Sequence, residues 1–244
     1  MKMSEEGDNV PNNNSSNFGF GGTTNNRGYM SYYGPGGRML LVESALEAVS
    51  RGSTTIGIKT PAFALTSSYI KPTRPLMEPS EKIFNIDGHV GATGAGYIGD
   101  ILQSIDELRI QAQKHRLTFE TPIDIASLIK HLSSYLHTYT IYAVRPQAAS
   151  IIIAGKDQMG TQLYQVDPGG TYFRGSAFTI GQFADTALNL IQQEYSADMS
   201  AEQAIQLSKK AIERAVGEEK PLVDIGIVYA EEGIFRKLEV NPKP

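Results

Sequence analysis

Residues 51–59 read RGSTTIGIK, in which two small hydroxyl residues follow a glycine and open a strand-like run. Self-cleavage after Gly52 would expose Ser53 as an N-terminal nucleophile. The freed α-amine would then act as the base for its own hydroxyl group. The stretch therefore places a candidate nucleophile at the start of a strand.

Outward from this stretch, the hydrophobic pattern predicts a helix on one side and two strand pairs on the other. The helix covers 39–50, and a glycine follows just beyond its end. Residues 53–60 and 62–68 form the first strand pair, and 82–87 and 89–95 form the second around an Asp-Gly turn.

The rest of the chain alternates between blocks of helices and blocks of strands. The predicted elements, in order, are helices 100–115 and 124–142, strands 149–156 and 161–167, a strand-like passage 171–181, helices 183–195 and 201–216, and strands 222–230 and 234–240. Strands and helices that are segregated into blocks favour antiparallel sheets covered by helix layers over a doubly wound parallel sheet. The predicted fold class is therefore an α+β sandwich.

The composition of the chain excludes several classes of partner and of chemical site. The chain has 244 residues with a net charge of −4, which argues against nucleic acid as a partner. It has no cysteine, which excludes a thiolate zinc site and a cysteine nucleophile. No apolar run approaches about 18 residues, so we expect no membrane span. The polar, acidic N-terminus is not a secretory signal, and we expect a cytoplasmic protein.

The N-terminal segment differs in composition from the remainder. Residues 1–28 are rich in Asn, Ser and Gly and carry few residues that form a core. Such a segment gains too little burial to offset its ordering entropy, so we expect a mobile tail. Residues 29–244 are predicted to form one domain.

Two other patterns suggest ligands, and neither is supported by its context. Gly94, Gly96 and Gly99 match the dinucleotide-binding fingerprint, but a second helix follows where that site needs a parallel strand. We expect these glycines to serve close packing and predict no cofactor. The spacing of the four histidines, two of which lie at 131 and 137, does not fit a helical metal site, and no metal is predicted.

Several longer blocks carry a family resemblance. They are GPGGRMLLVESALEAVSRGSTTIGIK (34–59), EPSEKIFNIDGHVGATGAG (78–96), HTYTIYAVRPQAASIIIAGKDQMGTQLYQVDPGGTYF (137–173) and FADTALNLIQQEYSADMSAEQAIQLSKKAI (183–212). From about Gly34 to the C-terminus, the chain resembles proteasome subunits of the α type, which belong to the 20S core particle and to a family of threonine peptidases. The resemblance implies the four-layer αββα sandwich of N-terminal-nucleophile hydrolases, in which antiparallel sheets lie between helix layers.

The resemblance implies a non-catalytic subunit. Catalytic β subunits need a free N-terminal threonine, whereas Ser53 stands at that position behind the helix that α subunits retain. The carboxylate of the next strand in β subunits falls at Ser67. Lys82 and Asp224 do match β-type positions, although α subunits share the lysine. The alternative is a self-processing hydrolase that uses Ser53 after cleavage from Gly52.

As an α-type subunit, the chain is expected to form a seven-membered ring that caps a chamber of β subunits. ATPase activators would dock their C-terminal tails between neighbours, and protein substrates would enter for degradation. Its N-terminal tail would occupy the pore and slow entry.

The residues implied in these roles are divergent. The Tyr-Asp-Arg gate motif is absent, and the nearest gate candidates are Arg27, Tyr29 and Pro35. The usual docking lysine falls at Tyr69, so the pocket candidates are Gly52, Tyr69 and Lys71. The residues implied in ring packing are Val42, Glu43 and Ala45.

Overall fold

The computed structural model describes residues 33–34, 37, 39–71, 76–142 and 145–238, which form two compact units divided after residue 40. In the first unit, Tyr33 and Met39 form an isolated antiparallel bridge. The predicted tail, 1–28, and the gate candidates Arg27, Tyr29 and Pro35 lie outside the described residues.

The described residues contain five helices and ten strands, in the block order that the sequence predicts. The helices are α1 (Leu40–Ser50), α2 (Ile98–Phe119), α3 (Ile125–Tyr142), α4 (Ala184–Glu194) and α5 (Ala201–Val216). The strands are β1 (Thr55–Lys59), β2 (Phe63–Tyr69), β3 (Ile83–Asp87), β4 (Val90–Gly96), β5 (Ala149–Asp157), β6 (Gly160–Val166), β7 (Tyr172–Arg174), β8 (Ala177–Ile180), β9 (Val223–Tyr229) and β10 (Phe235–Leu238).

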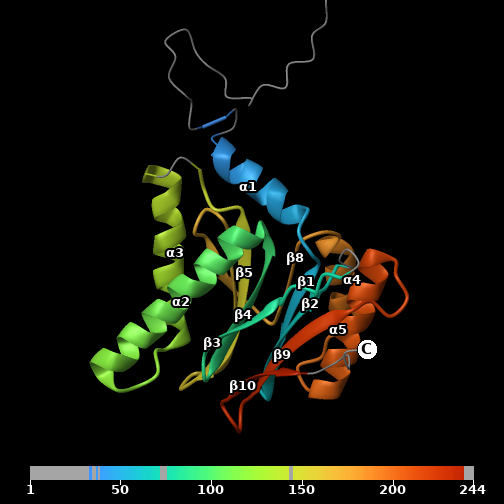
Figure 1. The fold of residues 1–244 in the computed structure, drawn as a ribbon. Coiled ribbons are helices and arrows are strands. Elements are labelled where there is room, and N and C mark those ends of the chain that lie inside the picture. The colour runs from blue at the N-terminus through green and yellow to red at the C-terminus, as the bar shows by residue number, and fades with distance from the viewer. Residues whose placement is uncertain (1–32, 35–36, 38, 72–75, 143–144, 239–244) are drawn as a thin grey trace, which may run out of the picture. The chain divides into compact units, whose positions relative to one another are not determined.

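The strands form two antiparallel sheets that face one another. One sheet has the order β10-β9-β2-β1-β8, and the other has the order β3-β4-β5-β6-β7. Helices α2 and α3 cover the outer face of the second sheet, while α4 and α5 cover the first (Figure 1). The second unit is therefore the predicted α+β sandwich with four layers, αββα.

Three apolar clusters hold these layers together. One joins α2 and α3 to their sheet, one joins α4 and α5 to theirs, and a third lies between the sheets. The helix faces follow the sequence pattern: Ile101, Ile105 and Leu108 of α2 are spaced by three or four residues and are all buried. Helix α5 begins at a capping box formed by Ser200 and Gln203, as its sequence predicts.

One predicted passage is divided between the sheets. Residues 171–181 read as one strand-like run, but β7 pairs with β6, and β8 pairs with β1 in the other sheet. Gly175 and Ser176 lie between the two strands and carry the chain across. Alternation of polar and apolar residues indicates which face a side chain occupies, and it does not indicate which sheet the strand joins.

Helix α2 is longer than the sequence predicts. It continues to Phe119 and ends at Glu120, whose φ of 57° is left-handed. The sequence pattern did not predict this last turn, because Leu117 and Phe119 are exposed and do not continue the apolar stripe of α2. Among the described residues, no helix combines the length and the apolar character that crossing a bilayer requires.

Candidate functional site

A row of polar side chains crosses the first sheet near the start of β1. Thr55 lies opposite Ser68, and Ser68 lies opposite Asp224 on the next strand. Side chains that are directly opposite in antiparallel strands point to the same face. On this face, the space above Gly57 is filled by Ile152 of the other sheet. The polar row therefore faces the space between the sheets, and Thr55 Oγ1 lies 2.8 Å from Ser68 Oγ.

Asp224 connects this row to two lysines. Its Oδ2 accepts the backbone N–H of Lys82 at 3.0 Å and lies 3.0 Å from Lys237 Nζ. Burial, followed by the positive charge of Lys71, lowers the pKa of Lys82, and Asp224 opposes this shift. Burial alone would lower the pKa of Lys237, but Glu81 and Asp224 raise it above its usual value. The carboxylate of Asp224 is therefore engaged by the lysines.

Ser53 lies within the chain, two residues before Thr55 of this row. It is buried, and its nitrogen is joined to Gly52 in a peptide bond. Its carbonyl accepts a hydrogen bond from Thr55 Oγ1 at 3.1 Å. Ser67 is buried, and as a neighbour of Ser68 it points to the opposite face of β2. Ser53 and Ser67 are therefore not brought together in one site.

The backbone crowds tightly beside Ser53, at the turn from β4 into α2. A side chain on Gly52 would place its Cβ 2.4 Å from the nitrogen of Gly96. Gly96 has a φ of +124°, and its Cβ would lie 2.1 Å from the oxygen of Ala148. Gly94 is also crowded, whereas a Cβ on Gly99 would meet only the Tyr97 ring, at 3.2 Å. Gly94 and Gly96, two of the three glycines that matched a nucleotide fingerprint, therefore serve a close crossover.

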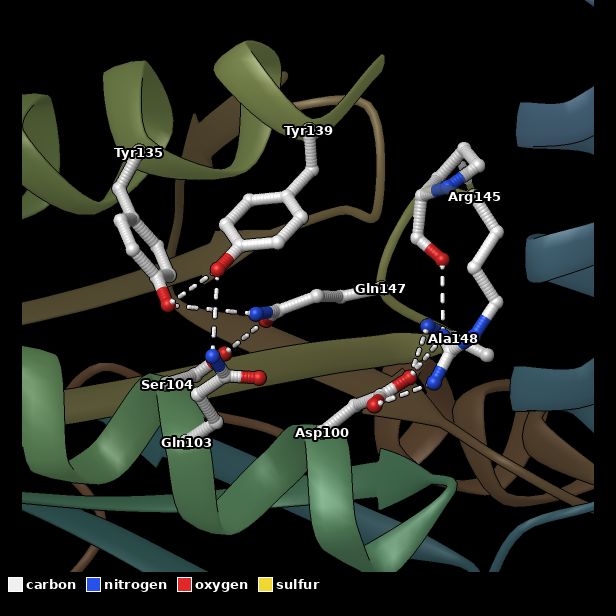
Figure 2. Close-up of polar contacts among 9 residues, drawn as sticks. Asp100, Gln103, Ser104, Tyr135, Tyr139, Arg145, Gln147 and Ala148 are labelled. Carbon is white, nitrogen blue, oxygen red and sulfur yellow. Dashed lines mark hydrogen bonds and ion pairs between the residues drawn. The ribbon is translucent and has the colours of Figure 1, made fainter. Parts of the chain in front are cut away.

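An ion pair between Asp100 and Arg145 also stabilises this turn from β4 into α2. Asp100, in the first turn of α2, accepts two hydrogen bonds from the guanidinium of Arg145, at 2.7 and 2.9 Å (Figure 2). It also accepts the backbone N–H of Ala148 at 2.7 Å, and the carbonyl of Ala148 accepts from Tyr97 N. Burial alone would raise the pKa of Asp100, but these donors hold it below its usual value. The start of α2 is thereby tied to the start of β5.

A chain of neutral polar groups continues this link to α3. Gln147 is buried, accepts the hydroxyl of Ser104 at 2.8 Å and donates to the hydroxyl of Tyr135 (Figure 2). Tyr135 and Tyr139 share a further hydroxyl contact at 3.2 Å. Burial, followed by Tyr139, raises the pKa of Tyr135, so its hydroxyl stays neutral. These contacts support the fold and provide no nucleophile.

Two of the histidines form contacts elsewhere in the layer of α2 and α3. His131 Nε2 lies 2.6 Å from Glu107 Oε1, which joins α3 to α2. His89 contacts the carbonyl of Ile123 at 2.8 Å in the loop between these helices. In the described ranges, no group of three or more acidic, histidine or cysteine residues is placed to hold a metal ion.

Comparison with known proteins identifies the family. The sequence matches the family described as "Proteasome subunit" over residues 49–226. This chain belongs to the proteasome subunit family. The family assignment agrees with the αββα sandwich and with the blocks of sequence that resemble α-type subunits.

Curated relatives specify the α type. "Proteasome subunit alpha" of Methanopyrus kandleri is 36% identical over 213 residues, which cover 86% of this chain and 87% of that protein. The protein of the same name from Pyrococcus horikoshii is 35% identical, with 86% and 82% covered. That from Methanothermobacter thermautotrophicus is 35% identical, with 86% of each chain covered. The chain is therefore an α-type proteasome subunit.

In this α-type proteasome subunit, the docking candidates point in different directions. The Tyr69 side chain is buried against α5, and its hydroxyl donates to Glu218 Oε1 at 2.8 Å. Burial, followed by the hydrogen bond to Glu218, raises the pKa of Tyr69 to about 12. Lys71 is exposed and turns back toward the other candidate, Gly52, because its Nζ donates to the carbonyl of Arg51 at 3.4 Å. Lys71 and Gly52 are therefore neighbours, and Tyr69 is directed into the core.

The ring-packing candidates also divide between two faces of α1. Ala45 is buried against this chain's own body, and Val42 lies against Gly169. Glu43 is exposed. The sequence reasoning did not single out Leu46, which is 38% exposed and lines a groove of about 510 Å³ with Phe183, which is 52% exposed.

The Asp100–Arg145 pair was also missed by sequence reasoning. The partners are 45 residues apart, so no local period connects them. One signal was present: a carboxylate in the first turn of a helix is favoured by the helix dipole, and this one falls next to the apolar stripe of α2. A charged residue beside a buried stripe indicates a partner, but the sequence does not identify it.

Proposed function

We propose that this α-type proteasome subunit is a non-catalytic, ring-forming subunit that acts in intracellular protein degradation. The likeness to proteins named "Proteasome subunit alpha" carries the proposal. The surroundings of Ser53 support it, because the position implied for the carboxylate of catalytic β subunits holds Ser67, whose side chain points to the opposite face of β2 from the polar row. Self-processing at Ser53 is the alternative, and it would remove residues 1–52.

The proposed assembly is a seven-membered ring that stacks on proteasome β subunits. Obligate interfaces bury apolar side chains, and Leu46 of α1 and Phe183, which line one groove, are large apolar side chains that remain exposed. We therefore assign lateral packing to Leu46 and Glu43, and we assign Ala45 to the subunit's own core. Native mass spectrometry of the purified chain tests the assembly, and a chain that remains a monomer with its β partner would contradict it.

The second part of the proposal concerns activator docking. A pocket between neighbouring subunits that binds the C-terminal carboxylate of an activator needs a positively charged side chain beside accessible backbone groups. Lys71 Nζ lies beside the carbonyl of Arg51, next to Gly52; burial lowers the pKa of the nearby Lys82, and the charge of Lys71 adds to this shift. The hydroxyl of Tyr69 already donates a hydrogen bond to Glu218. Lys71 is therefore our candidate for the docking lysine.

Replacing Lys71 with alanine is expected to weaken docking at least tenfold, because a charge-assisted hydrogen bond contributes about 1.5–3 kcal/mol. Fluorescence anisotropy with an activator's C-terminal peptide on the assembled particle measures the affinity. An amidated peptide should bind the normal particle as weakly as the free-acid peptide binds the variant. The exposed Lys130 provides the matched control, Lys130→Ala. Equal affinity of Lys71→Ala and the unaltered chain would remove the assignment.

The third part of the proposal is that residues 1–28 gate the pore. The support comes from the sequence: the segment is polar, rich in asparagine and glycine, and precedes the helix at 40–50. Deleting residues 1–27 is expected to raise peptide hydrolysis by the assembled particle severalfold, because a barrier to entry is removed. Fluorogenic peptide turnover measures this, and an unchanged rate with intact rings would rule out gating.

A further inference from the structure

A second hollow lies at the opposite end of β1 from Ser53. It has a volume of about 370 Å³, and four separate segments line it. These are the end of β1 with its turn, the β5–β6 turn, the connection from β7 to β8, and the loop between α4 and α5. The strand between the two sites has five residues, which at about 3.3 Å each separate them by about 17 Å. The hollow is therefore distinct from the proposed docking and ring-packing residues.

Among the described residues that line this hollow, two are cations and none is a carboxylate. Lys59 and Arg174 contribute the charged side chains, and the remaining lining residues are neutral: Thr60, Pro61, Met159, Gly160, Thr161, Ser176, Tyr195 and Ala197. Within the described part of the chain, neither cation forms an ion pair. Burial, followed by the positive charge of Arg174, lowers the pKa of Lys59. Two neighbouring cations are thus left without a counter-charge.

Hydrogen bonds among neutral groups connect the segments that line the hollow. Thr161 Oγ1 donates to the carbonyl of Thr60 at 2.6 Å, and Tyr195 donates to the carbonyl of Lys59 at 2.9 Å. The backbone N–H of Lys59 donates to the carbonyl of Ser176 at 2.8 Å. These bonds tie the other three segments to the end of β1, and they fix the position from which Lys59 extends. The cation N–H groups remain as donors for a ligand.

We propose that this hollow binds a phosphate group, either as free phosphate or carried by a small molecule. A guanidinium presents a planar fork that matches two phosphate oxygens, and an ammonium adds a point charge. The volume lies at the lower end of the range for small-molecule sites. A bound anion would remove the repulsion between Lys59 and Arg174. The inference does not depend on ring formation or on activator docking.

Isothermal titration calorimetry of the full chain with inorganic phosphate tests this site, with chloride at equal ionic strength as the reference. Saturable binding of phosphate, and not of chloride, is expected. Phenyl phosphate in a second arm distinguishes the sources: tighter binding than phosphate indicates a phosphate ester, and weaker binding indicates the free ion. The absence of saturable binding for both probes would overturn the proposal.

Variants place the binding in the hollow. Arg174→Gln and Lys59→Gln are each expected to weaken phosphate binding at least tenfold, and Lys59→Arg is expected to retain it. Arg174 is exposed, so its replacement leaves the fold intact. Lys130→Gln, which removes an exposed cation from α3, is the matched control and is expected to bind normally. Equal weakening by Lys130→Gln, or normal binding by Arg174→Gln, would contradict the site.

Discussion

Replacing Leu46 with glutamate is expected to convert the proposed ring into monomers at concentrations where the unaltered chain is fully assembled. Leu46 of α1 is 38% exposed and lines a groove with Phe183. A carboxylate buried without a partner costs several kcal/mol. Because 1.4 kcal/mol changes an equilibrium constant tenfold, a loss of about 3 kcal/mol per interface raises the concentration needed for assembly at least a hundredfold.

Light scattering coupled to size-exclusion chromatography measures the effect on the chain expressed alone. The control is Leu117→Glu, which adds the same charge at a position that is 85% exposed near the end of α2. The control should form rings, and both variants should unfold at similar temperatures. Rings formed by Leu46→Glu, or rings lost equally in the control, would show that this side of α1 is not the lateral contact.

Replacing Asp100 with alanine is expected to lower the free energy of unfolding by about 3 kcal/mol, because the ion pair and a backbone donor lose their acceptor. Asp100 is 5% exposed and accepts from both Arg145 and Ala148. Arg145 has a side chain that is 56% exposed and regains water, which keeps the loss below that of a fully buried pair. Urea unfolding at pH 7 measures the difference.

The matched control for this change is Asp106→Ala on the same helix. Asp106 forms an exposed ion pair with Arg109 at 3.3 Å, and such surface pairs contribute at most about 1 kcal/mol. The loss for Asp106→Ala is therefore expected to be small. Losses of equal size in the two variants would show that the Asp100 pair has no special role.

The Asp100 contribution should also depend on pH. Its folded pKa lies below its usual value, so the stabilisation is fully present above the unfolded pKa of about 3.9 and is lost as the pH falls through the folded pKa. The difference between the unaltered chain and Asp100→Ala should shrink as the pH is lowered from about 5 to 2. A difference that stays constant over this range would contradict the ionic account.

The layered fold could be predicted because local patterns report burial directly. The stripe of Ile101, Ile105 and Leu108 has a helical period and is buried as expected. The block order then favoured two antiparallel sheets between helix layers. The division of 171–181 between two sheets was not predictable, because β7 pairs with the preceding strand at Tyr164, whereas β8 pairs with the distant Ile58.

The candidate site was less predictable, since side-chain direction depends on packing between layers. All seven residues of β2 are buried, although the strand contains both polar and apolar residues. The polar or apolar character of its residues therefore did not indicate that the Tyr69 side chain packs in the core against α5. Helix α1 has apolar residues on two sides, and the pattern did not separate Ala45, which is buried, from Leu46, which is partly exposed. The close approach of Gly52 to Gly96 arises between segments more than forty residues apart and has no local signal.

Native mass spectrometry of the chain, alone and mixed with its β partner, tests the central proposal most directly. We expect a subunit of 26.6 kDa with residues 1–52 retained, in a seven-membered ring that binds β subunits. This result would support a ring-forming subunit that is not processed at Ser53. A stable monomer under both conditions, or a chain that begins at Ser53, would contradict the account.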